Sequence, residues 1–191
     1  MKINTFYKIL ISSYGFSLFS ESILVPIYAI FVQKIGGDIL AASGAMATFL
    51  LTQGIFTLII HRVQWKNKIA LLCGGWIIWV IGIASYLFIS NIFMLFVTQI
   101  LTAMGNAIAD PLLFEELAEH TDRRAKEFEW RFFSGLEALV GGVAAIIGGL
   151  VATFYGFTIL IYMMIASATI SLLFILYYIK QQRHQGILHR F

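Results

Sequence analysis

The sequence contains one cysteine, two prolines and few charged residues, and these scarcities exclude several classes of protein. Only 12% of its 191 residues are charged, whereas 60% are hydrophobic. A soluble domain of this length cannot bury so much apolar surface, so the composition predicts an integral membrane protein. The single cysteine, Cys73, permits no intrachain disulfide and offers no redox pair.

The sequence also lacks the short motifs that carry the chemistry of soluble enzymes. It contains no Walker loop, no HExxH pair and no GxSxG elbow. The stretch FEELAEH combines glutamates with a histidine, but at a spacing that suits no zinc site. We therefore expect neither an enzyme nor a metal site, and no cofactor.

Six apolar segments are long enough to cross a bilayer, which requires about 20 residues. They occupy residues 6–32, 39–60, 69–89, 92–113, 132–154 and 157–179. The sequence therefore predicts one all-α transmembrane domain over residues 1–191. Residues 117–130 carry both charge signs and neither glycine nor proline, so we expect them to form an amphipathic linker helix on the cytoplasmic surface.

The basic residues gather on one side of the predicted bundle. Of the thirteen lysines and arginines, Lys34 alone falls in a loop on the opposite side. The positive-inside rule then places both termini in the cytoplasm and makes the chain a multi-pass protein of the inner membrane. The net charge of +3 reflects this anchoring, so no nucleic-acid partner is expected.

The two prolines occupy corresponding positions in two triplets of spans. Pro26 lies deep in the first span and Pro111 deep in the fourth, and Glu21 and Asn106 each precede their proline by five residues. Because a triplet contains an odd number of spans, the two triplets run in opposite orientations. The pattern predicts a 3+3 inverted-topology repeat.

Polar side chains lie on one face of the first span. At about 100° per residue, this face holds Tyr14, Ser17, Glu21 and Tyr28, which fall within about 60° of one another. A charge at the bilayer centre costs about 2.5–3.5 kcal/mol on insertion scales, so Glu21 should face protein or water. The alternative is a protonated Glu21 that hydrogen-bonds a neighbouring helix as a packing contact.

The fourth span repeats this arrangement. Gln99, Asn106 and Asp110 share one face, and Thr102 lies at its edge. For Gln99 and Asn106, cavity lining and interhelical hydrogen bonding are equally compatible with the pattern. The predicted substrate and proton cavity consists of Glu21, Tyr14, Ser17, Tyr28, Gln53, Gln99, Thr102 and Asn106.

Charges near the cytoplasmic ends of the spans form a second predicted group. We interpret this group as a cytoplasmic gate or charge network made of Asp110, Arg123, Arg124, Arg131 and Glu137. The alternative is a set of ordinary salt bridges at the membrane edge. In the fifth span, small residues four apart, including Gly141, Ala145 and Gly149, permit close packing of helices.

The fourth span, QILTAMGNAIADP, resembles the R-x-x-x-G-x-G motif in the fourth helix of the major facilitator superfamily. Gln99 stands at the arginine of the motif and Gly105 at its second glycine. The segment SILVPIYAIFVQKIGGDILAASGAMA resembles the first helix and outer loop of the same family. The segment from LLFEELAEH to VGGVAAIIGGLVA is similar to the helix-4 to helix-5 region of efflux-like members of this family.

Three departures from the family pattern are visible. The loop HRVQWKNK keeps the basic charge of the usual G-x-x-x-D-R-x-G-R-K but not its acidic residue or glycines. Ala144 and Ala145 precede Gly148 and Gly149 where the antiporter motif has Gly-Pro, so antiport is not implied. Gln99 replaces the arginine, which removes any role that the family gives to that charge.

Superfamily members have two six-helix halves with the substrate site between them. The resemblance implies that this chain supplies one half, a half-transporter. Alone, it would show its polar face to lipid, at several kcal/mol for each unsatisfied group. We expect a parallel homodimer, with its two-fold axis along the membrane normal, in which the first, second, fourth and fifth spans enclose a central cavity.

The resemblance also implies secondary active transport of small organic solutes by alternating access. In several proton-coupled members an acidic residue of helix 1 takes part in coupling, and Glu21 matches that location. We therefore expect the proton gradient to drive transport. The alternatives are a non-transporting membrane partner or assembly subunit, and one half of a heterodimeric or truncated transporter.

Overall fold

The chain folds into a bundle of helices, and no strand is found among the residues described. The computed structural model describes residues 5–62, 67–120 and 126–184. Its elements are α1 (Thr5–Ser22), η1 (Val25–Ile27), α2 (Tyr28–Lys34), α3 (Ile39–His61), α4 (Lys68–Ser85), η2 (Tyr86–Phe88), α5 (Ile92–Glu119), α6 (Lys126–Phe154) and α7 (Phe157–His184). They supply six spans that are long and apolar enough to cross a membrane, which confirms the predicted fold class.

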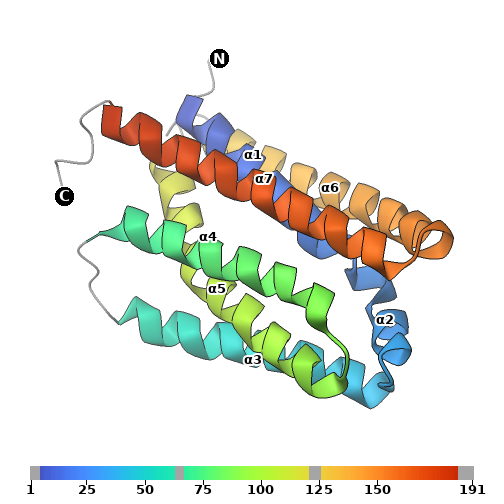
Figure 1. The fold of residues 1–191 in the computed structure, drawn as a ribbon. Helices are drawn as coiled ribbons and strands as arrows, with labels where there is room; N and C mark the ends of the chain where they lie inside the picture. The colour runs from blue at the N-terminus through green and yellow to red at the C-terminus, as the bar shows by residue number, and fades with distance from the viewer. Residues whose placement is uncertain (1–4, 63–66, 121–125, 185–191) are drawn as a thin grey trace.

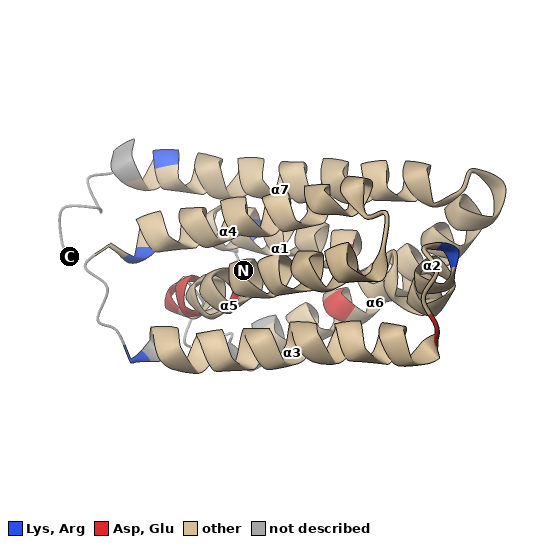
Figure 2. Cartoon of the chain, turned by 60° about the horizontal axis from the view of Figure 1, so that its bottom comes forward, with Lys and Arg blue, Asp and Glu red and all other residues tan. Residues whose placement is uncertain are grey.

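The spans form three layers, as Figures 1 and 2 show together. Helices α7 and α4 lie side by side on one face, α1 and α5 occupy the middle, and α3 and α6 lie on the opposite face. Both termini lie at the same end of the bundle (Figure 1). Among the residues that the structure describes, most basic ones gather at this end, and a further one lies at α2 on the other end (Figure 2).

The first span is not the single helix that the sequence predicts. It consists of α1, a turn, the 3-10 segment η1 and α2. Pro26 has no N–H, and the N–H of Ile27 donates to the carbonyl of Leu24 rather than to that of Ile23. The carbonyl of Ile23 therefore loses its helical donor. This break lies directly after the turn of α1 that carries Glu21.

Two further boundaries differ from the prediction. The third span ends in η2, so its last α-helical residue is Ser85 rather than residue 89. Helix α5 continues through Glu119 and α6 begins at Lys126, so both ends of segment 117–130 belong to the flanking spans. Among the described residues of that segment there is no separate helix, because its charged residues continue the flanking helices α5 and α6. Its centre, residues 121–125, lies outside the described residues.

Serine side chains join α1 to α7 through buried hydrogen bonds. The hydroxyls of Ser13 and Ser171 donate to each other's backbone carbonyls at 2.9 and 2.8 Å. The Ser20 hydroxyl donates to the carbonyl of Met164 at 2.9 Å, and the Nε1 of Trp76 donates to the Ser171 hydroxyl at 2.9 Å. In lipid, such bonds hold helices together where no hydrophobic force between them acts. Helices α1, α7 and α4 are thereby tied into one unit.

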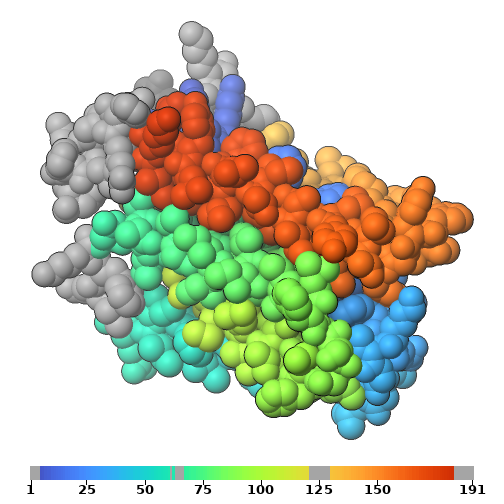
Figure 3. All heavy atoms as spheres, viewed as in Figure 1, coloured from blue at the N-terminus to red at the C-terminus, as the bar shows by residue number. Residues whose placement is uncertain are grey.

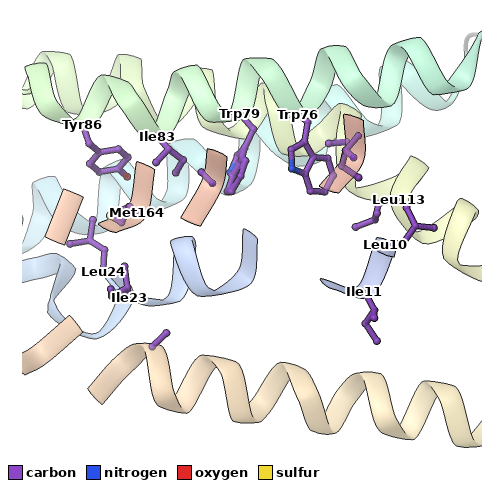
Figure 4. Packing of buried hydrophobic residues seen from close by; sticks show 14 of the residues in the cluster. Leu10, Ile11, Ile23, Leu24, Trp76, Trp79, Ile83, Tyr86, Leu113 and Met164 are labelled. Atoms are coloured by element: carbon purple, nitrogen blue, oxygen red, sulfur yellow. The ribbon is translucent and has the colours of Figure 1, made fainter. Parts of the chain in front are cut away.

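Glycines allow α4 and α5 to cross with their backbones in contact. A Cβ atom at Gly105 of α5 would lie 2.5 Å from the backbone nitrogen of Trp79, and one at Gly82 of α4 would lie 2.9 Å from the Cα of Thr102. No side chain fits at these distances, so the crossing requires glycine. The close approach sets the position of Trp79, whose indole points with that of Trp76 from α4 toward α1 (Figure 4).

Candidate functional site

Glu21 lies where α1, α4 and α5 meet, halfway through the bundle. Its Oε1 atom accepts a hydrogen bond from the Nε1 of Trp79 at 2.9 Å and another from the Nδ2 of Asn106 at 2.7 Å. Trp79 is only 2% exposed and Asn106 only 6%. Glu21 therefore faces the protein interior, where polar donors replace the water that it would lose in a membrane.

The two donors leave one carboxylate oxygen available. Both reach Oε1, and the described part of the chain provides no donor to Oε2. A protonated carboxyl group carries its hydrogen on one oxygen and still accepts at the other. Glu21 can therefore gain or lose a proton at Oε2 without breaking its bonds to Trp79 and Asn106.

Glu21 lines two cavities, one on each side of it. The first, here called the terminal-side cavity, has a volume of about 130 Å³ and lies toward the end of the bundle that holds the termini. Its lining is Tyr14, Ser17, Leu18, Glu21, Trp76, Trp79, Asn106, Ala109, Asp110 and Phe114. The second, the far-side cavity, has a volume of about 110 Å³ and is lined by Glu21, Leu24, Val25, Tyr28, Met46, Phe49, Ile83, Tyr86, Gln99, Thr102 and Met164.

In the far-side cavity, the side chains of Tyr28 and Gln99 are joined. The Nε2 of Gln99 donates to the Tyr28 hydroxyl at 2.5 Å, which ties α5 to α2 beyond the break in the first span. Gln99 is 5% exposed. Gln99 therefore makes a neutral interhelical bond and also lines a cavity.

In the terminal-side cavity, Tyr14 connects α1 to α6. Its hydroxyl donates to the Oε1 of Glu137 at 3.3 Å. Its ring stacks on Phe133, with 4.8 Å between centroids, and meets the edge of Phe114 at 5.6 Å. Trp130 packs against Phe133 in turn, at 5.7 Å. An aromatic cluster therefore lies beside this cavity, and two of its rings, Tyr14 and Phe114, line it.

The predicted charge network is only partly visible. The Nε2 of Gln53 donates to the Oδ2 of Asp110 at 3.3 Å, so a predicted cavity residue on α3 contacts a predicted gate residue on α5. Arg131 is exposed on α6. Arg123 and Arg124 lie outside the described residues. The contacts that the structure gives for Asp110 and Glu137 are thus hydrogen bonds to Gln53 and Tyr14.

Two of the predicted cavity residues use their hydroxyl protons locally. The Ser17 hydroxyl donates to the carbonyl of Tyr14 at 2.8 Å, and the Thr102 hydroxyl donates to the carbonyl of Thr98 in the same helix. Each lines a cavity but presents an acceptor to it rather than a donor. Their contribution to a site is therefore polarity and space.

Polar side chains of the first and fourth spans line the two cavities and are here called the polar strip: Tyr14, Ser17, Glu21, Tyr28, Gln99, Thr102, Asn106 and Asp110. Two of them contact α3 and α6, the least buried spans of the bundle. Gln53 reaches the strip from α3 and Glu137 reaches it from α6. Small-molecule sites usually have volumes of about 300–1,000 Å³. Neither cavity of a single chain reaches that size, although the two share Glu21 as a lining residue.

The most important residue of the site that sequence reasoning missed is Trp79. It belongs to a span whose side chains are almost uniformly apolar, so no polar periodicity marks which face is buried. A tryptophan has an apolar body and one N–H donor, which is what a carboxylate within lipid requires. The aromatic cluster was missed for the same reason, because its rings look like lipid-facing residues in the sequence.

A six-span helical bundle with a carboxylate at its centre, between two cavities, is typical of multi-pass membrane transport proteins. The sequence matches the family described as Major Facilitator Superfamily over residues 10–189, and the chain belongs to this superfamily. Its six spans correspond to one six-helix half of the superfamily fold. Members of the superfamily are membrane transporters. No curated protein matches the chain.

Glu21 and Asn106 occupy corresponding positions in the two triplets of the predicted inverted repeat. Their side chains are in direct contact. A local two-fold axis between the two triplets would bring corresponding residues together in this way. The two prolines behave differently, since Pro26 lies in a break and Pro111 lies inside the continuous α5. The repeat is compatible with these contacts and remains a prediction.

Proposed function

We propose that the chain is a secondary active transporter of small organic solutes that works as a parallel homodimer by alternating access. The observation that carries this proposal is the position of Glu21, which lines two cavities that extend from it toward opposite ends of the bundle. A site between two such cavities is what a transporter needs if each side is to open in turn. In this proposal both termini face the cytoplasm.

The small volume of the two cavities supports the proposal that a second copy of the chain completes the site. Volumes of about 130 and 110 Å³ are too small for an organic solute. A two-fold axis along the membrane normal, passing beside α3 and α6, would place the strip of one protomer opposite that of its partner. The paired cavities would then form one central site, and polar groups such as Glu137 would be removed from lipid.

The charges of the strip favour a cationic solute. The two cavities are lined by the carboxylates of Glu21 and Asp110 and by no basic residue. Tyr14, Phe114 and Trp79 add aromatic surface, which attracts cations through the ring face. A dimer would hold twice as many carboxylates and aromatic rings around its central site. It would therefore prefer an organic cation with an aromatic body.

Proton coupling through Glu21 completes the proposal. A carboxylate that neutralises a cation can instead be neutralised by a proton, so the two would compete for the same site. The free Oε2 atom is where the proton would reside. The proton gradient would then drive the solute through the rocking of two halves around the Glu21 pair.

A flux assay tests this function. We expect purified protein in liposomes to move a fluorescent aromatic cation when a pH gradient is imposed. Like charges placed together cost several kcal/mol, so we expect more than about tenfold slower flux of a size-matched aromatic carboxylate. Empty liposomes are the control. Flux of neither solute would contradict the proposal and favour a non-transporting partner subunit.

A further inference from the structure

The largest of the three cavities described here lies away from the transport site, between α4 and α7. Its volume is about 520 Å³, and it is lined by Asn67, Ile69, Ala70, Cys73, Gly74, Ile77, Leu176, Ile179 and Lys180. Figure 3 shows the face of the bundle that α7 and α4 build. The polar strip faces α3 and α6 instead, so this face stays in contact with lipid even when a second copy covers the strip.

The α4–α7 cavity has the depth of one membrane leaflet. Along α4 its lining runs from Asn67 to Ile77. Ten residues of helix span about 15 Å, and the hydrocarbon core of a bilayer is about 30 Å thick. The apolar part of the cavity therefore begins at the end of the bundle that holds the termini and reaches the middle of the membrane.

The small side chains of α4 create the hollow. A Cβ atom added at Gly74 would meet nothing within 4 Å, so open space lies beside this residue. Ala70 and Cys73 are also small, whereas Leu176 and Ile179 form the opposite wall on α7. Such a narrow apolar channel fits a hydrocarbon chain.

The outer end of the cavity is cationic. Lys180 lines it, and among the described residues Lys180 has no ion-pair partner. The neighbouring Lys68 is engaged differently, because its ammonium group pairs with Glu115 of α5. Basic pockets between spans on the cytoplasmic side recognise lipid head groups. Lys180 therefore supplies an unpaired positive charge at head-group level above an apolar channel.

The geometry points to a binding site for one anionic phospholipid of the surrounding bilayer in the α4–α7 cavity. An acyl chain occupies the channel beside Gly74, and the phosphate of the head group pairs with Lys180. The site lies outside the transport strip and does not depend on the proposed function. Lipid bound here would brace α4 against α7, the two helices that carry Trp76 and Ser171.

Lipid retention by the detergent-purified full chain, measured by native mass spectrometry, tests this site. We expect wild-type protein to retain one phosphatidylglycerol per chain more tightly than phosphatidylcholine with the same acyl chains. A single lysine near the head groups is worth about a fivefold change in affinity. Lys180→Gln should therefore weaken phosphatidylglycerol about fivefold and make the two lipids equal. Gly74→Leu, which fills the channel, should displace both.

Lys8→Gln is the matched control, because Lys8 is an exposed lysine at the same end of the bundle but outside the cavity. It should leave retention unchanged. Equal retention of the two lipids by wild-type protein would overturn the assignment, as would unchanged retention in Lys180→Gln. An equal loss in Lys8→Gln would do the same, because it would indicate general surface charge. Lys180→Gln is a surface substitution, so the test stands even if Gly74→Leu fails to fold.

Discussion

Glu21→Gln abolishes proton-driven accumulation of solute in liposomes while the bundle remains folded. The glutamine side chain is nearly the same shape, and its carbonyl oxygen still accepts from Trp79 and Asn106, which both bind Oε1 in the wild type. It has no carboxyl proton to exchange. The substitution therefore removes the proposed coupling and leaves the packing in place.

The size of the effect follows from the driving force. A pH gradient of about 1.7 units is worth about 2.3 kcal/mol per proton, and one-for-one exchange of a proton for a cation would convert this into an accumulation of about fiftyfold. For one coupled proton, we expect the solute concentration ratio across the liposome membrane to approach about fiftyfold with wild-type protein. With Glu21→Gln the two concentrations should become equal. Glutamine leaves Asp110 as the remaining carboxylate of the two cavities, so exchange of labelled for unlabelled cation should be slower in the variant and should not respond to the pH gradient.

The control for this experiment is Glu119→Gln. Glu119 is an exposed glutamate at the end of α5, outside both cavities, so the same chemical change there should leave accumulation intact. If Glu21→Gln protein still accumulates solute in proportion to the pH gradient, Glu21 is not the coupling residue.

Gly148→Ala destabilises the protein strongly, whereas the adjacent Gly149→Ala does not. A Cβ atom at Gly148 would lie 1.9 Å from the carbonyl oxygen of Ile23, which is backbone and cannot rotate away. Helix α6 therefore packs directly on the break in the first span, one turn from Glu21. Overpacking of this kind costs about 1–3 kcal/mol, and we expect the upper end of that range.

A Cβ atom at Gly149 would meet nothing within 4 Å. Alanine is also favoured over glycine in a helix by up to about 1 kcal/mol, so Gly149→Ala should be neutral or stabilising. The measurement is the midpoint of thermal unfolding of both variants in the same detergent. Equal midpoints would show that α6 does not approach Ile23 as the structure has it.

The spans and the direction of Glu21 could be predicted from the sequence because a bilayer imposes simple rules. A hydrocarbon core requires about 20 apolar residues for each helix. A central carboxylate must turn toward protein or water, but its contact with Asn106 was not predicted, because the matching distances from the prolines indicated only a repeat. The resemblance to the superfamily was seen in the sequence segment around Gln99, and the match over residues 10–189 confirms it.

The remaining features depend on where helices cross, which periodicity does not reveal. Trp79 meets Glu21 only because Gly105 lets α5 approach the backbone of α4. The pairing of Ser13 with Ser171 depends likewise on the register between α1 and α7. The break in the first span was missed because Pro26 could have been tolerated within a helix, as Pro111 is in α5.

The central claim is that the polar strip beside α3 and α6 requires a second copy of the chain to close it. The most direct test is the protein mass of the particle solubilised in a mild detergent, with the detergent contribution subtracted. A homodimer predicts twice the 21.5 kDa of one chain. A stable particle of 21.5 kDa that still moves solute after reconstitution at one chain per liposome would contradict the claim.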